Sequence, residues 1–103
     1  MLFRSAVENL SISDAVLRKI NTRHGVELLE VRQCFLNKNG KLLFDNRALT
    51  KTDPPTLWFI AKTNKKRSLK IVYILKNSQI ILKTAYEPNE TELAIYGRYG
   101  AAR

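Results

Sequence analysis

The chain has 103 residues, of which 45% are hydrophobic and 26% are charged, so a wholly disordered or fibrous protein is excluded. Its length predicts a single domain over residues 1–103, with a core at about 11–99 and flexible termini. The single cysteine, Cys34, excludes an intrachain disulfide framework and a zinc site built on two thiolates.

The charge is strongly basic and concentrated in one segment. Lys and Arg total 18 against nine Asp and Glu, a net charge of +9, and residues 46–86 hold nine bases and one acid. Such a local positive field favours an acidic protein or a nucleic acid as partner. Because no apolar run approaches the roughly 18 residues of a membrane span, we expect a cytoplasmic protein with no membrane partner.

Two helices are predicted in the first third of the chain. Apolar residues at helical spacing follow Ser11 or Ser13, either of which can be an N-cap, and continue to about Arg23. Gly25 suits the left-handed position that ends many helices. A second helix is expected from about Glu27 to Leu36.

Four strands and a third helix follow. The strands are expected at Lys41–Asp45, Leu57–Thr63, Leu69–Lys76 and Gln79–Tyr86. Asn89 with Glu92 forms a capping pair for the last helix, whose apolar face comprises Leu93, Tyr96 and Tyr99. The predicted fold class is α+β: two N-terminal helices, a four-stranded mostly antiparallel sheet and a C-terminal helix, with Leu2 to Val7 as a candidate extra edge strand.

Strand alternation places several basic side chains together. Lys62, Lys70 and Lys83 are expected on one face of the sheet, Lys83 together with Ile81 and Ala85, and Arg67 at the hairpin edge. Cleavage of RNA through its own 2′-hydroxyl needs a base, an acid and cations that stabilise the charge on phosphorus. The predicted catalytic residues are Lys62, Arg67, Lys70, Lys83 and Tyr86, and the predicted RNA-binding residues are Arg47, Lys65, Lys66 and Lys76.

Other reactive side chains have structural interpretations. His24 precedes Gly25 and is expected to cap a helix, and Cys34 is expected to be a core thiol. Of the neighbours Trp58 and Phe59, one should face the helices and the other is a candidate for exposure. The carboxylates are scattered and no glycine-rich phosphate loop is present, so neither a metal site nor a cofactor site is predicted.

Four segments together resemble the BrnT family within the RelE/ParE superfamily of bacterial toxins. They are Arg23-His24-Gly25-Val26, Ile60 to Thr63, Arg67 to Tyr73 and Ile80 to Asn89, and the resemblance covers roughly residues 15–99. It implies a RelE/BrnT-like fold, cleavage of messenger RNA, and neutralisation by a cognate antitoxin, acidic or of the ribbon-helix-helix class. Chains similar to this one also carry the name ADP-ribosyl-dinitrogen-reductase hydrolase, which the scattered carboxylates do not support.

The resemblance has two departures, which bear on activity. Lys62 and Tyr86 stand where BrnT-like chains commonly have arginines, and neither offers the two parallel hydrogen bonds of a guanidinium. The sequence therefore supports two hypotheses. The first is a toxin that cleaves messenger RNA by metal-independent acid–base chemistry, and the alternative is a noncatalytic RNA-binding or protein-binding module on the same scaffold.

Overall fold

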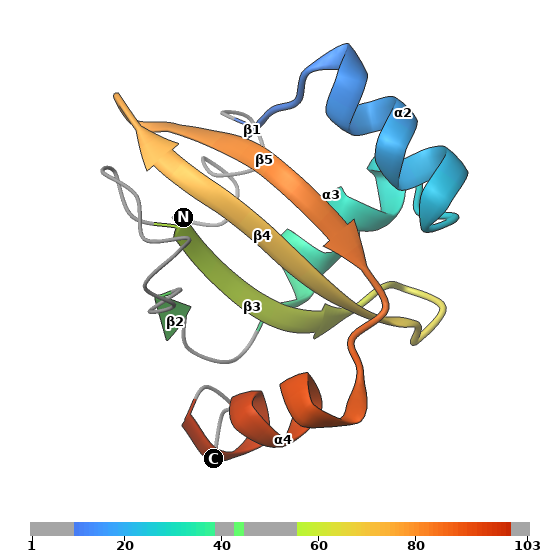
Figure 1. Ribbon diagram of the computed structural model, residues 1–103, viewed down its shortest axis with the longest axis vertical. Coiled ribbons are helices and arrows are strands. Elements are labelled where there is room, and N and C mark those ends of the chain that lie inside the picture. The colour runs from blue at the N-terminus through green and yellow to red at the C-terminus, as the bar shows by residue number, and fades with distance from the viewer. Residues whose placement is uncertain (1–9, 39–42, 45–55, 100–103) are drawn as a thin grey trace.

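A computed structural model of the protein describes residues 10–38, 43–44 and 56–99. The fold is α+β, as predicted, with helices α2 (Asp14–Arg23), α3 (Leu28–Asn37) and α4 (Glu90–Tyr99). The strands are β1 (Leu10–Ser11), β2 (Leu43–Phe44), β3 (Thr56–Lys62), β4 (Ser68–Lys76) and β5 (Gln79–Tyr86). Figure 1 shows β3, β4 and β5 side by side, with α4 apart from the other helices.

The sheet has the order β1-β5-β4-β3-β2. The three long strands form the predicted antiparallel meander, and β2 extends it in the antiparallel sense beside β3. The outer strand β1 pairs in parallel with β5, through Leu10 and Ile80. The extra edge strand predicted at Leu2 to Val7 lies outside the described residues, as does Arg47, whereas Leu10–Ser11 forms a described edge strand.

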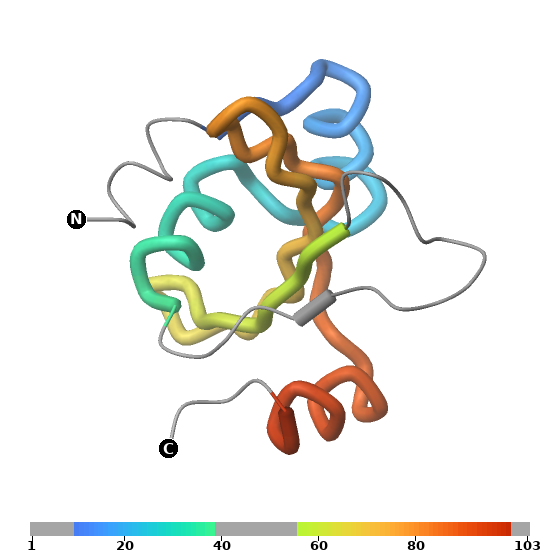
Figure 2. The backbone as a smooth tube through the Cα atoms, turned by 90° about the vertical axis from the view of Figure 1, so that its left-hand side faces the viewer, coloured from blue at the N-terminus to red at the C-terminus, as the bar shows by residue number. Residues whose placement is uncertain are grey.

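The first helix begins and ends as its sequence predicts. Ser13 is the N-cap of α2, and its hydroxyl accepts a hydrogen bond from the backbone N–H of Val16 at 3.2 Å. His24 is the C-cap, and Gly25 follows with φ of +60°, a conformation that is strained for residues with a Cβ. The chain then turns into α3, which lies along one side of the long strands (Figure 2).

We call the sheet side that α2 and α3 cover the helix face. Phe59, Ile71 and Leu82 lie on it, and each is at most 1% exposed. Phe35 of α3 packs edge-on against Phe59 and Tyr73, with ring centroids 5.0 and 5.5 Å apart. The hydrophobic core lies in this layer and holds the sheet rigidly against both helices.

Cys34 belongs to this core, as predicted. Its thiol is fully buried and donates a weak hydrogen bond to the carbonyl of Ala61 at 3.6 Å. Burial raises the pKa of Cys34 to about 12, because the thiolate would lose its hydration. At neutral pH the thiol therefore stays protonated and contributes packing.

The opposite side of the sheet, which we call the second face, carries Trp58, Lys70 and Tyr86. Trp58 is only 8% exposed, because Tyr96 of α4 packs on it with ring centroids 5.8 Å apart. Trp58 and Phe59 are therefore both buried, and the candidate exposed position is covered by α4. No helix in the described ranges has the length and apolar character needed to cross a bilayer.

Candidate functional site

Arg67 fastens the β3–β4 turn to the helices. Its Nη1 donates to both carboxylate oxygens of Glu30 at 3.0 and 3.1 Å, and to the carbonyl of Gly25 at 2.9 Å. Its Nη2 donates to the carbonyl of His24 at 3.2 Å, and its Nε donates to Glu87 at 2.8 Å. This guanidinium is a structural clamp, and it points toward the helix layer.

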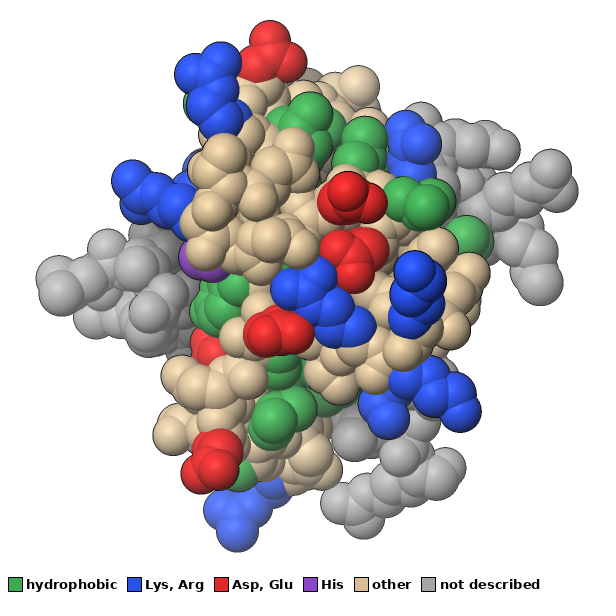
Figure 3. Space-filling view, turned by 90° about the vertical axis from the view of Figure 1, so that its right-hand side faces the viewer, with side chains coloured by type: hydrophobic (Ala, Val, Ile, Leu, Met, Phe, Trp, Pro, Cys, Tyr) green, Lys and Arg blue, Asp and Glu red, His purple; other side chains and the backbone are tan. Residues whose placement is uncertain are grey.

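The charge around Arg67 is balanced. The hydrogen bond from Arg67 to Glu87, and then that to Glu30, raise the pKa of the guanidinium, although desolvation opposes them. Figure 3, which views the molecule from the right-hand side of Figure 1, shows acidic and basic side chains side by side near the centre of that surface. The clamp therefore presents little net positive field to a phosphate.

On the second face, Lys70 and Tyr86 meet at Glu92 of α4. The register pairs Lys70 with Tyr86 across β4 and β5, so both side chains emerge side by side. Lys70 Nζ and the Tyr86 hydroxyl each donate to the same Oε2 of Glu92, both at 2.6 Å. The side chains of Lys70 and Glu92 are only 13% and 16% exposed, so this ion pair is largely shielded from water.

Glu92 also closes the first turn of its own helix. Its Oε1 accepts from the backbone N–H of Asn89 at 3.0 Å, and Asn89 Oδ1 accepts from the backbone N–H of Glu92 at 2.8 Å. The predicted capping pair is thus present. Burial alone would raise the pKa of Glu92, but hydrogen bonds from Lys70, Tyr86 and Asn89 together hold it below its ordinary value.

Aromatic rings surround the Lys70 ammonium. Lys70 Nζ lies 4.4 Å from the centroid of the Trp58 ring and 5.7 Å from that of Tyr86, within the range of cation–π attraction. The His24 ring packs against Tyr86 with centroids 5.5 Å apart. Lys70 is therefore held in place by a carboxylate and two rings, which fixes the position of its charge.

A cleft of about 450 Å³ lies beside this cluster, between α4 and the ends of β3 and β4. Ile60 of this cleft pairs with Lys70 across β3 and β4, and Leu93 follows Glu92 in the chain. The volume falls in the range of small-ligand sites. The lining residues are Asn37, Ile60, Ala61, Lys62, Ser68 and Leu93.

The remaining predicted basic residues are distributed along the sheet. Lys62 is exposed on the second face at the cleft, as alternation predicts. Lys65 and Lys66 are exposed in the β3–β4 turn, next to Lys62 in the chain. Lys76 lies at the other end of β4, six residues from Lys70 and so roughly 20 Å away along an extended strand.

Lys83 does not follow the predicted alternation. Val72 pairs with Thr84 and Tyr73 pairs with Leu82, so Lys83 is the extra residue of a β-bulge without a partner on β4. Ile81 consequently lies on the second face, whereas Ala85 is buried on the helix face. The prediction that Lys83, Ile81 and Ala85 share one face is wrong because the bulge shifts the strand by one residue.

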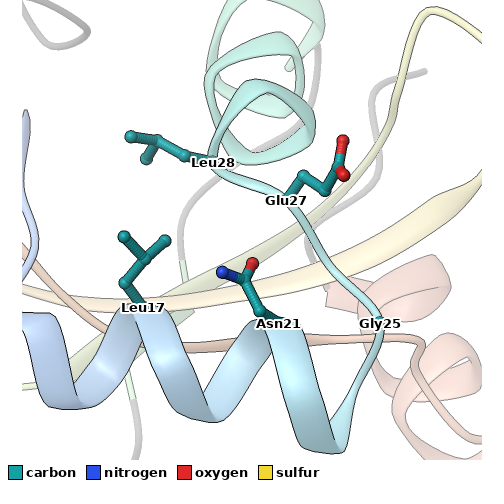
Figure 4. A pocket seen from close by; sticks show the side chains of 5 residues that line it. All are labelled: Leu17, Asn21, Gly25, Glu27 and Leu28. Carbon is teal, nitrogen blue, oxygen red and sulfur yellow. The ribbon is translucent and has the colours of Figure 1, made fainter.

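A second cleft, of about 550 Å³, lies between α2 and α3. Figure 4 shows Leu17 and Asn21 projecting from α2 toward the start of α3, where Glu27 and Leu28 lie. Its one charged lining residue is acidic and it contains no Lys or Arg. Among the described clefts, the one that Lys62 lines is therefore better suited to a polyanion.

Sequence reasoning identified Lys62, Lys70 and Tyr86 but missed the role of Glu92. The spacing of Asn89 and Glu92 indicates a cap, yet nothing local indicates that the same carboxylate reaches the sheet.

No family model, curated protein or solved structure matches this chain. The resemblance to BrnT-like toxins therefore stays a prediction.

Proposed function

We propose that this protein is an endoribonuclease, the toxin of a bacterial type II toxin–antitoxin system, and that it binds RNA on the second face beside α4. The observation that carries the proposal is the convergence of Lys70 and Tyr86 on one oxygen of Glu92, next to a cleft that Lys62 lines. These groups supply positive charge, a phenolic proton donor and a carboxylate next to this cleft.

The chemistry divides among these residues. Lys62 and Lys70 stabilise the negative charge that builds on phosphorus when the 2′-hydroxyl attacks. Tyr86 donates a proton to the leaving 5′ oxygen as its bond to phosphorus breaks, while solvent water accepts the proton that the attacking 2′-hydroxyl loses. Glu92 orients Tyr86 and Lys70. Arg67 and Lys83 are not needed in this arrangement, because the first clamps the helices and the second lies in the bulge.

The proposed partner is an antitoxin that covers the same face. Helix α4 exposes the apolar side chains of Leu93, Ile95 and Tyr99, with exposed fractions of 44%, 41% and 61%. A partner that combines acidic groups for Lys62 with apolar groups for this helix would block RNA from the cleft. RNA binding that is undiminished in the purified complex would contradict this.

The test compares cleavage with binding. The purified chain is expected to cleave single-stranded RNA, and one 2′-deoxy nucleotide at the cleaved position should block the reaction. Tyr86→Phe keeps the ring and removes the hydroxyl, so cleavage should fall about a hundredfold while RNA binding stays within about twofold. Tyr99→Phe removes a hydroxyl from an exposed tyrosine at the end of α4 and is the matched control.

The outcomes separate the two hypotheses. Cleavage in wild type and its loss in Tyr86→Phe support the ribonuclease, together with growth arrest on induced expression. Binding without cleavage supports a noncatalytic RNA-binding module, the alternative that the occupied hydrogen bonds of Lys70 and Tyr86 favour. A chain that neither binds nor cleaves RNA contradicts the ribonuclease and the RNA-binding module, and it supports the protein-binding module.

A further inference from the structure

The cleft beside α4 contains a polar side chain whose orientation is fixed. Asn37, in the last turn of α3, donates through Nδ2 to the backbone carbonyl of Lys62 and to Asn64 Oδ1, both at 2.9 Å. Asn64 is held in turn, because its backbone N–H donates to Gln33 Oε1 at 3.0 Å. This network fixes the orientation of the Asn37 amide in the absence of a ligand.

These hydrogen bonds leave the carbonyl oxygen of Asn37, Oδ1, available to bind a ligand. An asparagine amide has two N–H donors and one carbonyl acceptor, and both donors are used. Within residues 10–38, 43–44 and 56–99, no donor is directed at Asn37 Oδ1. Because Asn37 is exposed and lines the cleft, this fixed acceptor is accessible to a ligand.

The other walls of the cleft suit a flat apolar ring with a phosphate attached. Leu93 is 44% exposed and Ile60 is half-buried, so a ring in the cleft would remove apolar surface from water. Lys62 supplies positive charge at the same cleft, and Ser68 adds a hydroxyl. A nucleobase with its phosphate combines these features, and unstacked bases of single-stranded RNA are recognised in this way.

We propose that this cleft holds one nucleobase of single-stranded RNA and selects bases that carry an amino group on the pairing edge. Asn37 Oδ1 accepts a hydrogen bond from that amino group. Cytosine has an amino group where uracil has a carbonyl oxygen, and two oxygens would repel each other at that position. The inference rests on the proposed function, because it assigns a base preference to the same RNA-binding face.

The experiment measures binding of oligo(C) and oligo(U), each eight nucleotides long, by fluorescence anisotropy at one salt concentration. Both carry 2′-O-methyl groups, so that no 2′-hydroxyl can attack during the measurement. One neutral hydrogen bond predicts about three- to tenfold tighter binding of oligo(C) by the wild type. Lys62→Ala should weaken both oligonucleotides equally, because a phosphate contact carries no base information.

Two variants of Asn37 test the acceptor and the hydrogen bonds that fix it. Asn37→Ala removes the acceptor, so the two affinities should come within twofold of each other. Asn37→Asp loses both donors that orient the acceptor, so the preference for oligo(C) should also fall. Asn21→Ala changes an exposed helical asparagine of α2 and is the matched control. Leu93→Ala should weaken both oligonucleotides, and Leu75→Ala, an equally exposed leucine at the far end of β4, should not.

Each outcome has a distinct meaning. Equal binding of both oligonucleotides by wild type, or a preference that persists in Asn37→Ala, overturns the base subsite. A base preference without cleavage of unmodified RNA contradicts the ribonuclease and leaves the subsite intact. Cleavage without a base preference supports the ribonuclease and overturns the base subsite. Absence of any RNA binding contradicts both proposals.

Discussion

The two faces of the sheet are fastened to their helices in different ways. On the helix face, α2 and α3 bury a continuous apolar layer, and Arg67 clamps their connection with four hydrogen bonds and donates a fifth to Glu87 after β5. On the second face, α4 is held by Tyr96 on Trp58 and by Glu92 on Lys70 and Tyr86. The first face depends mainly on packing, whereas the second depends on a few polar contacts.

This difference distinguishes the stabilising role of Arg67 from the proposed functional role of Lys70. Arg67 and Lys70 are three residues apart, and both lie near the start of β4. Arg67 is surrounded by carboxylates and carbonyls of the helix layer, whereas Lys70 lies beside a cleft with exposed Lys62. Substitutions at the two positions should therefore affect different properties of the protein.

The largest effect is expected for Arg67→Ala. The change removes the clamp and leaves the half-buried carboxylate of Glu30 without its partner, so unfolding should require about 2–3 kcal/mol less free energy. Urea denaturation measures this loss. Lys65→Ala removes the same charge from an exposed position in the same turn and should stay within about 0.5 kcal/mol of wild type. Equal denaturation midpoints for Arg67→Ala and wild type would refute the clamp.

A smaller and more local effect is expected for Glu92→Gln. The amide keeps the shape of the side chain but loses the ion pair with Lys70, so stability should fall by about 1–2 kcal/mol. Amide hydrogen exchange should accelerate in α4 and stay unchanged in α3, because the helix face is fastened independently. Glu90→Gln, an exposed position in the same helical turn, is the control. Acceleration spread evenly over the whole chain would contradict independent fastening.

The same contact predicts a pH dependence. The pKa of Glu92 is lower in the folded protein than its ordinary value of 4.5, so its stabilising contribution is present above that pH. The contribution is lost as the pH falls through the lower folded pKa. The stability difference between wild type and Glu92→Gln should therefore shrink below about pH 4.5. A difference that stays constant between pH 7 and pH 3 would rule out this linkage.

The smallest effect lies at the end of the sheet far from both fastenings. Ser78 in the β4–β5 turn has φ of +65°, which glycine adopts without strain. Ser78→Gly should raise the free energy of unfolding by about 0.5–1 kcal/mol. Gln79→Gly, one residue later in β5, should lower stability instead. Thermal unfolding of the two variants distinguishes these signs.

The fold was largely predictable because its signals are local. Ser13, Gly25 and the Asn89–Glu92 pair mark helix ends through their own backbone geometry, and short turns specify the meander. The apolar face of α4 was predicted less well, since Tyr96 is buried whereas Leu93 and Tyr99 are exposed. Which apolar residue of a helix is covered depends on the sheet position where that helix docks.

The candidate site was predictable only where strand alternation holds. Alternation placed Lys62 and Lys70 on one face, and pairing brought Tyr86 beside Lys70. The roles of Arg67 and Glu92 depend on partners 37 and 22 residues away in the chain, which no local pattern indicates. The charge block in residues 46–86 therefore predicted a basic region without showing which of its members are already neutralised.

The bulge at Lys83 has a consequence for changes in chain length. Leu82 points to the helix face and Thr84 to the second face, so β5 would alternate regularly if Lys83 were deleted. The deletion would remove the carbonyl that accepts a hydrogen bond from Lys19 of α2 at 3.3 Å, while Ala85 and Tyr86 would keep their faces. Lys83 is thus the one residue of β5 that behaves as an insertion, and chains one residue shorter here can conserve the same two faces.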